Sequence, residues 1–129
     1  MEKYLIDTHV LIWMAQQPEN IPPLAKAILE SENEILLSYV CVWEIAIKVR
    51  TKKLEIQLEL PDYINSSVQK YGFQLFPITL SHIYHTFHLE LYHRDPFDRL
   101  LIAQSVFEDT PIISSDEIFD SYGVKRIWK

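Results

Sequence analysis

Tyr4-Leu5-Ile6-Asp7-Thr8-His9-Val10-Leu11-Ile12-Trp13, close to the start of the chain, carries the pattern on which the fold prediction depends. Its first three residues form a short apolar run that is typical of a buried strand, and this strand ends at Asp7. The residues from Thr8 to Ala15 have a helical pattern. A buried strand that leads directly into a helix is the unit from which parallel sheets are built.

The same alternation of short apolar runs and longer helical patterns continues along the chain. We expect further strands within residues 35–38, 73–76, 111–114 and 124–128, and helices that begin near Pro22, Val40, Pro61, Thr79 and Pro96. Strands separated by helices indicate a parallel sheet covered on both faces, which is an α/β fold. The helix over residues 40–52 is apolar around its circumference, so we expect it to be mostly buried. The helix after Thr79 should have an apolar face formed by Leu80, Ile83, Tyr84, Phe87 and Leu91.

Length and composition limit the classes of protein to which this chain can belong. The 129 residues, 48% hydrophobic and 23% charged, suit one globular domain over residues 1–129. A net charge of −6 argues against a general nucleic-acid coat. Two glycines cannot build a glycine-rich phosphate loop, and a single cysteine cannot form an intrachain disulfide. We find no signal-peptide pattern and no run of about 20 apolar residues, and so expect a cytoplasmic protein with no membrane partner.

Carboxylates follow or border four of the expected elements. Asp7 directly follows the first strand, and Asp116 comes shortly after the strand of residues 111–114. Sites in open parallel sheets lie at the carboxyl ends of the strands, so Asp7 and Asp116 should share one edge. Glu44 and Asp98 each lie in a helix bordered by core sequence. Clustered carboxylates repel one another and are stable at neutral pH mainly around a divalent cation; an all-oxygen set favours Mg²⁺ or Mn²⁺ over zinc.

Each of these acids also has a purely structural interpretation. Asp7 and Asp116 are suitable caps for the turns that follow them. Glu44 is as consistent with a buried salt bridge to Lys48, one helical turn away, as with a metal ligand. Asp95 precedes Pro96 and fits best as the N-cap of that helix, whereas this explanation is weaker for Asp98.

At these residues the sequence resembles PIN-domain ribonucleases, in particular the VapC-type toxins of bacterial toxin–antitoxin modules. The resemblance rests on four segments in the family's order, which are Leu5–Trp13, Ser38–Lys48, His93–Gln104 and Ile112–Asp116. A fifth, from Tyr122 to Trp128, resembles the closing strand. The resemblance extends over nearly the whole chain.

The resemblance implies a three-layer α/β/α domain with a five-stranded parallel sheet and Mg²⁺- or Mn²⁺-dependent hydrolysis of RNA. Asp7, Glu44, Asp98 and Asp116 match the acidic quartet of the family, which binds metal and performs catalysis. Ser114 matches a small hydroxyl residue that supports the site, and Asp95 is an ambiguous neighbour of Asp98. The family also implies a homodimer and inhibition by a small antitoxin protein.

Basic residues and histidines supply further candidates. Lys48 and Arg50 lie in a basic cluster after Glu44, and Arg99 adjoins Asp98, so all three are candidate contacts for RNA phosphates. The basic cluster is equally consistent with a solvated helix end, and Arg99 with an ion pair to an acid. His82, His85 and His88 spread around their helix, so we interpret them as a polar face rather than a zinc site. An inactive PIN-fold module that binds RNA or protein remains the alternative function. Phosphotransfer enzymes with an aspartate after the first strand fit less well, because His9 stands where a second aspartate is required.

Overall fold

A computed structural model describes residues 2–129 of the chain. The strands are β1 (Lys3–Ile6), β2 (Glu34–Ser38), β3 (Gln74–Phe76), β4 (Ile112–Ile113) and β5 (Arg126–Ile127). The helices are α1 (Thr8–Gln16), α2 (Pro23–Glu30), α3 (Tyr39–Arg50), α4 (Leu60–Tyr71), α5 (Leu80–Phe87) and α6 (Pro96–Phe107), together with the 3₁₀ helices η1 (Pro18–Asn20) and η2 (Glu117–Tyr122). These elements lie where the sequence predicts strands and helices.

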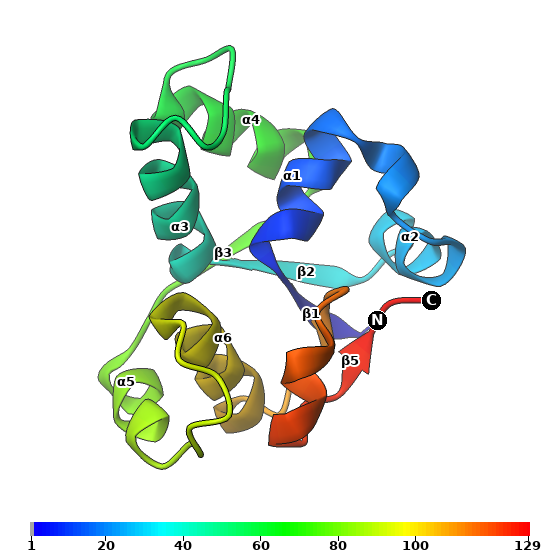
Figure 1. Cartoon of the computed structure of the whole chain (residues 1–129). Coiled ribbons are helices and arrows are strands. Elements are labelled where there is room, and N and C mark those ends of the chain that lie inside the picture. The colour runs from blue at the N-terminus through cyan, green and yellow to red at the C-terminus, as the bar shows by residue number, and fades with distance from the viewer. Residues whose placement is uncertain (1) are drawn as a thin grey trace.

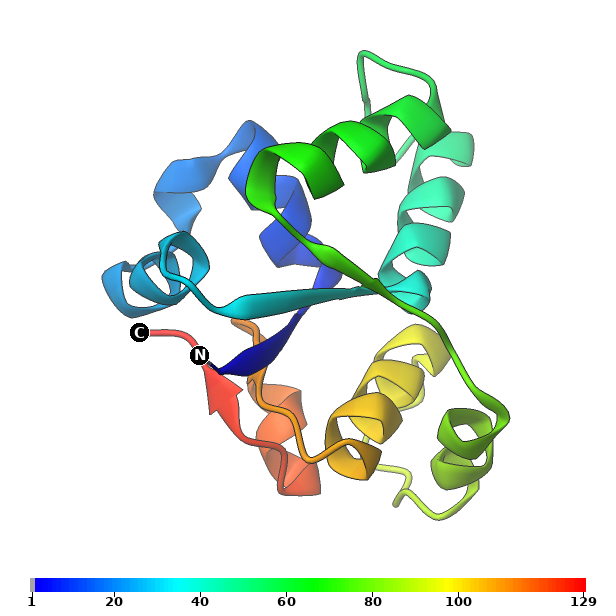
Figure 2. The same ribbon diagram turned by 180° about the vertical axis from the view of Figure 1, so that it is seen from behind.

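The strands form one sheet in the order β3-β2-β1-β4-β5, and every neighbouring pair is parallel. Figures 1 and 2 show α1, α2 and α4 on one side of this sheet and α5 and α6 on the other, with the two ends of the chain close together. The predicted three-layer α/β/α fold with five parallel strands is therefore confirmed. In the pairing of β1 with β4, Ile6 is opposite Ile113, so both strands end at the same edge.

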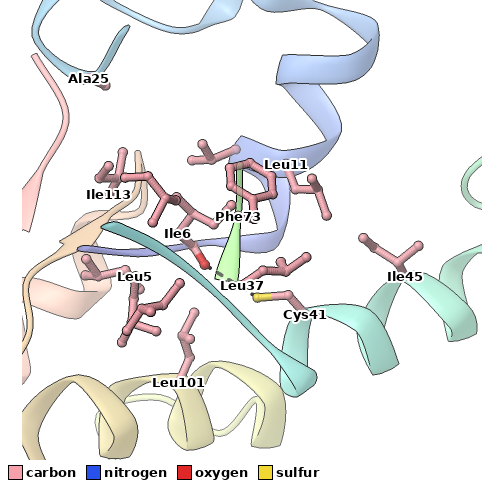
Figure 3. Close-up of a cluster of buried hydrophobic side chains, with 14 of the residues drawn as sticks. Leu5, Ile6, Leu11, Ala25, Leu37, Cys41, Ile45, Phe73, Leu101 and Ile113 are labelled. Carbon is pink, nitrogen blue, oxygen red and sulfur yellow. Dashed lines mark hydrogen bonds between the residues drawn. The ribbon is translucent and has the colours of Figure 1, made fainter. Parts of the chain in front are cut away.

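The core fills both faces of the central strands. Leu5, Ile6, Ile112 and Ile113 are fully buried, because a parallel sheet covered on both faces leaves no solvent-facing side. Figure 3 shows Leu5 on the side of Leu101 from α6, with Leu11 of α1 and Phe73 on the opposite side. This packing fixes the strand ends from which the site residues project.

The expectation that α3 is mostly buried is wrong. In α3, Val40, Cys41 and Ile45 are buried, but Trp43 is 55% exposed because only one face of this helix packs against the rest of the chain. The predicted apolar face of α5 is also exposed: Leu80, Ile83, Tyr84 and Phe87, together with Leu91 beyond the helix, all face solvent.

The opposite face of α5 packs inward through His82, which is fully buried and therefore not part of a polar surface. Its Nδ1 accepts a hydrogen bond from the backbone N–H of Thr79, and its Nε2 lies 2.8 Å from Oε2 of Glu108. This histidine is thus part of the capping box that begins α5. Each helix described within residues 2–129 is too short or too polar to span a lipid bilayer.

Candidate metal centre at the carboxyl edge of the sheet

Asp7 and Ser114 form the centre of the site, because the strands that precede them are paired. Ser114 Oγ donates a hydrogen bond of 2.6 Å to Oδ2 of Asp7, and the backbone N–H of His9 donates to Oδ1. Ser114 Oγ also accepts from the backbone N–H of Asp116, at 3.0 Å. One buried serine therefore links the two strand-end acids that the sequence predicts to share an edge.

Asp7 is almost completely buried, and burial raises the pKa of its carboxyl group above the ordinary value of 3.8. The hydrogen bond from Ser114 opposes this effect, whereas the charge of Asp116 adds to it. The carboxylate form of Asp7 is consequently costly when no cation is nearby. Its position as N-cap of α1, which the sequence also predicts, offsets part of this cost.

Glu44 lies in the second turn of α3, and its Oε1 accepts a hydrogen bond of 2.7 Å from the hydroxyl of Thr8. Among residues 2–129 no ion pair joins Glu44 to Lys48. The salt-bridge interpretation of Glu44 is therefore wrong. Glu44 instead faces the start of α1, next to Asp7.

Asp98 lies in the first turn of α6, and burial is the main cause that raises its pKa to about 6. The hydrogen bond with His93 lowers this pKa, whereas the charges of Asp7, Asp95 and Glu44 raise it. The carboxylates that raise the pKa of Asp98 therefore come from the end of β1, from α3 and from the start of its own helix. Figures 1 and 2 show the corresponding arrangement, in which α1, α3 and α6 begin close to one another beside the end of β1.

Cys41 lies in the core beneath the acids. It is fully buried, and its thiol donates a hydrogen bond to the carbonyl of Ile6 (Figure 3). Burial raises the pKa of Cys41, and the charges of Asp7, Glu44 and Asp98 raise it further. Asp7, Glu44 and Asp98 are therefore all near enough to this thiol to act on it electrostatically.

Asp95 is the N-cap of α6, as the sequence predicts. Its Oδ1 accepts hydrogen bonds from the backbone N–H groups of Phe97, at 2.8 Å, and Asp98, at 3.2 Å. Asp116 caps η2 in the same way through the N–H of Ile118, but it is exposed and belongs to the cluster as well. Capping and membership of the cluster are therefore compatible for Asp116.

His93 completes the cluster, and its place there was not predicted from the sequence. Its Nε2 lies 2.7 Å from Oδ2 of Asp98, and ligand atoms of His93, Asp98 and Asp116 all lie within 4.8 Å of one another. The helical-spacing argument that set the other histidines aside does not apply to His93, which lies in the loop between α5 and α6. Its proximity in sequence to Asp95 and Asp98 was the available signal.

Arg99 has a role different from the expected phosphate contact. Its two Nη atoms donate hydrogen bonds to the carbonyls of Thr86, Leu89, Glu90 and His93 and to the hydroxyl of Tyr122. These bonds hold the guanidinium group of Arg99 at the loop between α5 and α6.

The other two candidate phosphate contacts lie on α3. Lys48 lies one turn beyond Glu44 on the same face of the helix, whereas Arg50 is exposed at the helix end.

The donor set suits a hard divalent cation. Among residues 2–129, Oε2 of Glu44, Oδ1 of Asp98 and Oδ2 of Asp116 accept no hydrogen bond from another protein group. Carboxylate oxygens are the ligands that Mg²⁺ and Mn²⁺ prefer, and a bound cation would offset the repulsion among the acids. The residues therefore fit such a metal.

Comparisons with known proteins agree with this architecture. The family model of the PIN domain matches residues 4–125, whereas no curated protein sequence matches the chain significantly. A chain of VapBC2 from Rickettsia felis bound to promoter DNA is similar in structure, with a TM-score of 0.73, 10% identity and coverage of 98% of this chain and 99% of that one.

Two further solved structures have the same fold. For DNA-bound VapBC from Salmonella typhimurium the TM-score is 0.70, with 12% identity and 98% of each chain covered. VapBC-5 of Mycobacterium tuberculosis is a member of the VapBC family of toxin–antitoxin systems. Its TM-score to this chain is 0.61, with 16% identity and all of both chains covered. Because the family model covers nearly the whole sequence, the chain belongs to the PIN-domain family.

Proposed function

We propose that this protein is a metal-dependent endoribonuclease that hydrolyses RNA phosphodiester bonds, and that it is the VapC-type toxin of a toxin–antitoxin pair. The observation that carries the proposal is that ligand atoms of Asp98, in the first turn of α6, and Asp116, in the turn after β4, lie within 4.8 Å of one another. Ser114 links Asp116 to Asp7 at the end of β1, and Thr8, the next residue, binds Glu44 in the second turn of α3. Such a cluster is costly without a cation, and here it lies in a PIN fold.

In this proposal Asp7, Glu44, Asp98 and Asp116 hold Mg²⁺ or Mn²⁺ at the edge of the sheet. The ion supplies two effects when bound: it polarises the phosphoryl group and lowers the pKa of a water molecule. Ser114 and Thr8 orient the carboxylates of Asp7 and Glu44 through the hydrogen bonds described above. Hydrogen bonds of this kind keep metal ligands in position.

RNA binding requires positive charge near the acidic cluster, because the chain as a whole carries a net charge of −6. Lys48 is the best-placed candidate for a phosphate contact, since it lies one turn from Glu44 on α3. Arg50 extends the same basic helix end. Asp95 supports the site indirectly, by fixing the start of the helix that carries Asp98.

Two protein partners belong to the proposal. The similar solved structures are complexes named VapBC, and these support a small antitoxin protein as the inhibitor of this chain. The exposed apolar side chains of α5, with Phe87 79% exposed, support a homodimer, because large exposed apolar patches mark contact surfaces. Light scattering on the wild type and on Phe87→Glu tests the homodimer: a monomeric wild type would contradict it.

The experiment for the activity uses the purified full chain and a fluorescent RNA pool of random sequence. We expect cleavage with Mn²⁺ or Mg²⁺, none with a chelator and none by Asp7→Asn. Asp62→Asn, which changes an exposed carboxylate near the start of α4, is the matched control and should cleave like the wild type. An inactive binding module predicts instead that RNA binds, by fluorescence anisotropy, but stays intact with every ion.

A further inference from the structure

His93 lies in the acidic cluster with a geometry that suits a metal ligand. Its Nε2 and one carboxylate oxygen each from Asp98 and Asp116 lie within 4.8 Å of one another. Octahedral ligands at about 2.1 Å from a shared ion are about 3.0 Å apart when cis and about 4.2 Å apart when trans. Binding would therefore separate Nε2 of His93 slightly from Oδ2 of Asp98, which now lie 2.7 Å apart, and would draw the more distant ligand atoms together. The three residues come from the α5–α6 loop, the start of α6 and the turn after β4, so a shared ion would join three separate segments.

The backbone of His93 is held on both sides by residues outside the acidic cluster. Its N–H donates to the hydroxyl of Tyr122, at 2.8 Å, and its carbonyl accepts from Arg99, at 3.2 Å. Tyr122 also donates to the carbonyl of Glu90, at 2.7 Å, and thereby fixes the preceding part of the loop. The side chain is only 26% exposed. The imidazole is therefore presented to Asp98 and Asp116 by a pre-organised loop, which is the condition for a strong ligand.

We propose that His93 is a nitrogen ligand of a divalent cation that Asp98 and Asp116 also bind. An imidazole ligand favours Mn²⁺, Co²⁺ and other transition-metal ions over Mg²⁺, whereas carboxylates alone discriminate less. His93 therefore biases the site away from Mg²⁺ and towards transition-metal ions, Mn²⁺ among them. This inference rests on the proposed function only because it places the cation among the same carboxylates; it does not depend on the substrate.

Electron spin-echo envelope modulation of Mn²⁺ added to the full chain tests this assignment directly, because it detects a coordinated ¹⁴N nucleus and does not require activity. We expect imidazole ¹⁴N modulation in the wild type and its loss in His93→Gln. His9→Gln is the matched control, since His9 is the other histidine beside the acids and follows Asp7 on α1. The modulation should persist in this variant.

Calorimetry supplies the second readout. We expect His93→Gln to weaken Mn²⁺ binding about tenfold, and Mg²⁺ binding less than about threefold. Mn²⁺ that binds the wild type without ¹⁴N modulation, or modulation that is lost in His9→Gln rather than His93→Gln, overturns the role of His93 and leaves the proposed nuclease intact. A wild type that binds no Mn²⁺ overturns the role of His93, and one that binds neither Mn²⁺ nor Mg²⁺ overturns both proposals. If His93→Gln fails to fold, the spectrum of His9→Gln still decides the question, because modulation that persists without His9 leaves His93 as the histidine beside the acids, and modulation that is lost overturns the assignment.

Discussion

The hydroxyl of Thr8 donates a hydrogen bond of 2.7 Å to Oε1 of Glu44 and so joins the first residue of α1 to the second turn of α3. Asp7 immediately precedes this contact, at the end of β1. A carboxylate from a helix is thereby brought beside a carboxylate from a strand end. The contact also explains why Glu44 does not pair with Lys48, since its head group faces the sheet edge.

Glu44→Gln should have little effect on the metal-free protein, because the amide oxygen of glutamine can still accept from Thr8. We expect a loss of less than about 1 kcal/mol in the free energy of unfolding. Addition of Mn²⁺ should raise the melting temperature of the wild type but raise that of Glu44→Gln much less, since only the folded state assembles the site. Thermal melts with and without Mn²⁺ measure both effects.

The control for this prediction is Glu59→Gln, which changes an exposed carboxylate before α4 and should keep the full gain from Mn²⁺. A metal-independent loss of about 3–5 kcal/mol in Glu44→Gln would instead indicate a broken buried ion pair. That result would remove Glu44 from the proposed metal site.

Asp7→Asn should leave the metal-free protein folded and make it as stable as the wild type or slightly more stable at neutral pH. Burial raises the pKa of Asp7, so the folded state holds this proton more tightly than the unfolded state. The contribution of Asp7 to stability is therefore fully present below its ordinary pKa of 3.8 and is lost as pH rises through the raised value.

The difference in the free energy of unfolding between Asp7→Asn and the wild type should consequently grow in favour of Asp7→Asn as pH rises above about 4. Urea unfolding at a series of pH values without metal measures this difference. Asp62→Asn again serves as the control and should show no such growth. If Asp7→Asn is unfolded at neutral pH, the role of Asp7 is structural and its assignment to the metal site is wrong.

Asp95 and Asp98 should respond to substitution in opposite ways. Asp95→Ala removes two hydrogen bonds at the start of α6, and we expect it to cost about 1 kcal/mol of stability while retaining RNA cleavage. Asp98→Asn should keep the stability and lose cleavage, because it removes a metal-ligand charge. Equal loss of activity in both variants would show that Asp95 also belongs to the catalytic group.

Arg99→Met should destabilise the protein by about 2 kcal/mol or more, because it removes the donors that hold four carbonyls and the hydroxyl of Tyr122. Arg94→Met is the matched control, since Arg94 is exposed five residues earlier. Chemical denaturation of both variants gives the comparison. Unchanged stability together with a raised KM for RNA would instead indicate that Arg99 contacts an RNA phosphate, as the sequence suggested.

The strand-end part of the site was predictable from the sequence, because a residue that directly follows a buried parallel strand lies at the carboxyl edge of the sheet. Asp7 and the segment from Ser114 to Asp116 follow paired parallel strands, and such ends meet at one edge whatever the strand order. The N-cap role of Asp95 was equally local, since the Asp-Pro pair at the start of a helical pattern specifies it.

The remaining features depend on tertiary packing that no local pattern encodes. The contact of Thr8 with Glu44 and the loop bonds of Arg99 join segments whose relative position only the fold determines. The inward position of His82 on α5 was missed, because the apolar residues of this helix dominate any hydrophobicity pattern. His93 was missed for a related reason: a loop residue has no periodicity from which its direction can be inferred.

The central claim is that four carboxylates from four segments act as one metal site. Calorimetric titration of Mn²⁺ into the wild type and into Asp7→Asn, Glu44→Gln, Asp98→Asn and Asp116→Asn tests it most directly. We predict that each substitution weakens Mn²⁺ binding about tenfold or more, whereas Asp62→Asn and Glu59→Gln leave it unchanged. Unchanged Mn²⁺ affinity in the four site variants, or the same loss in the two controls, would contradict the account.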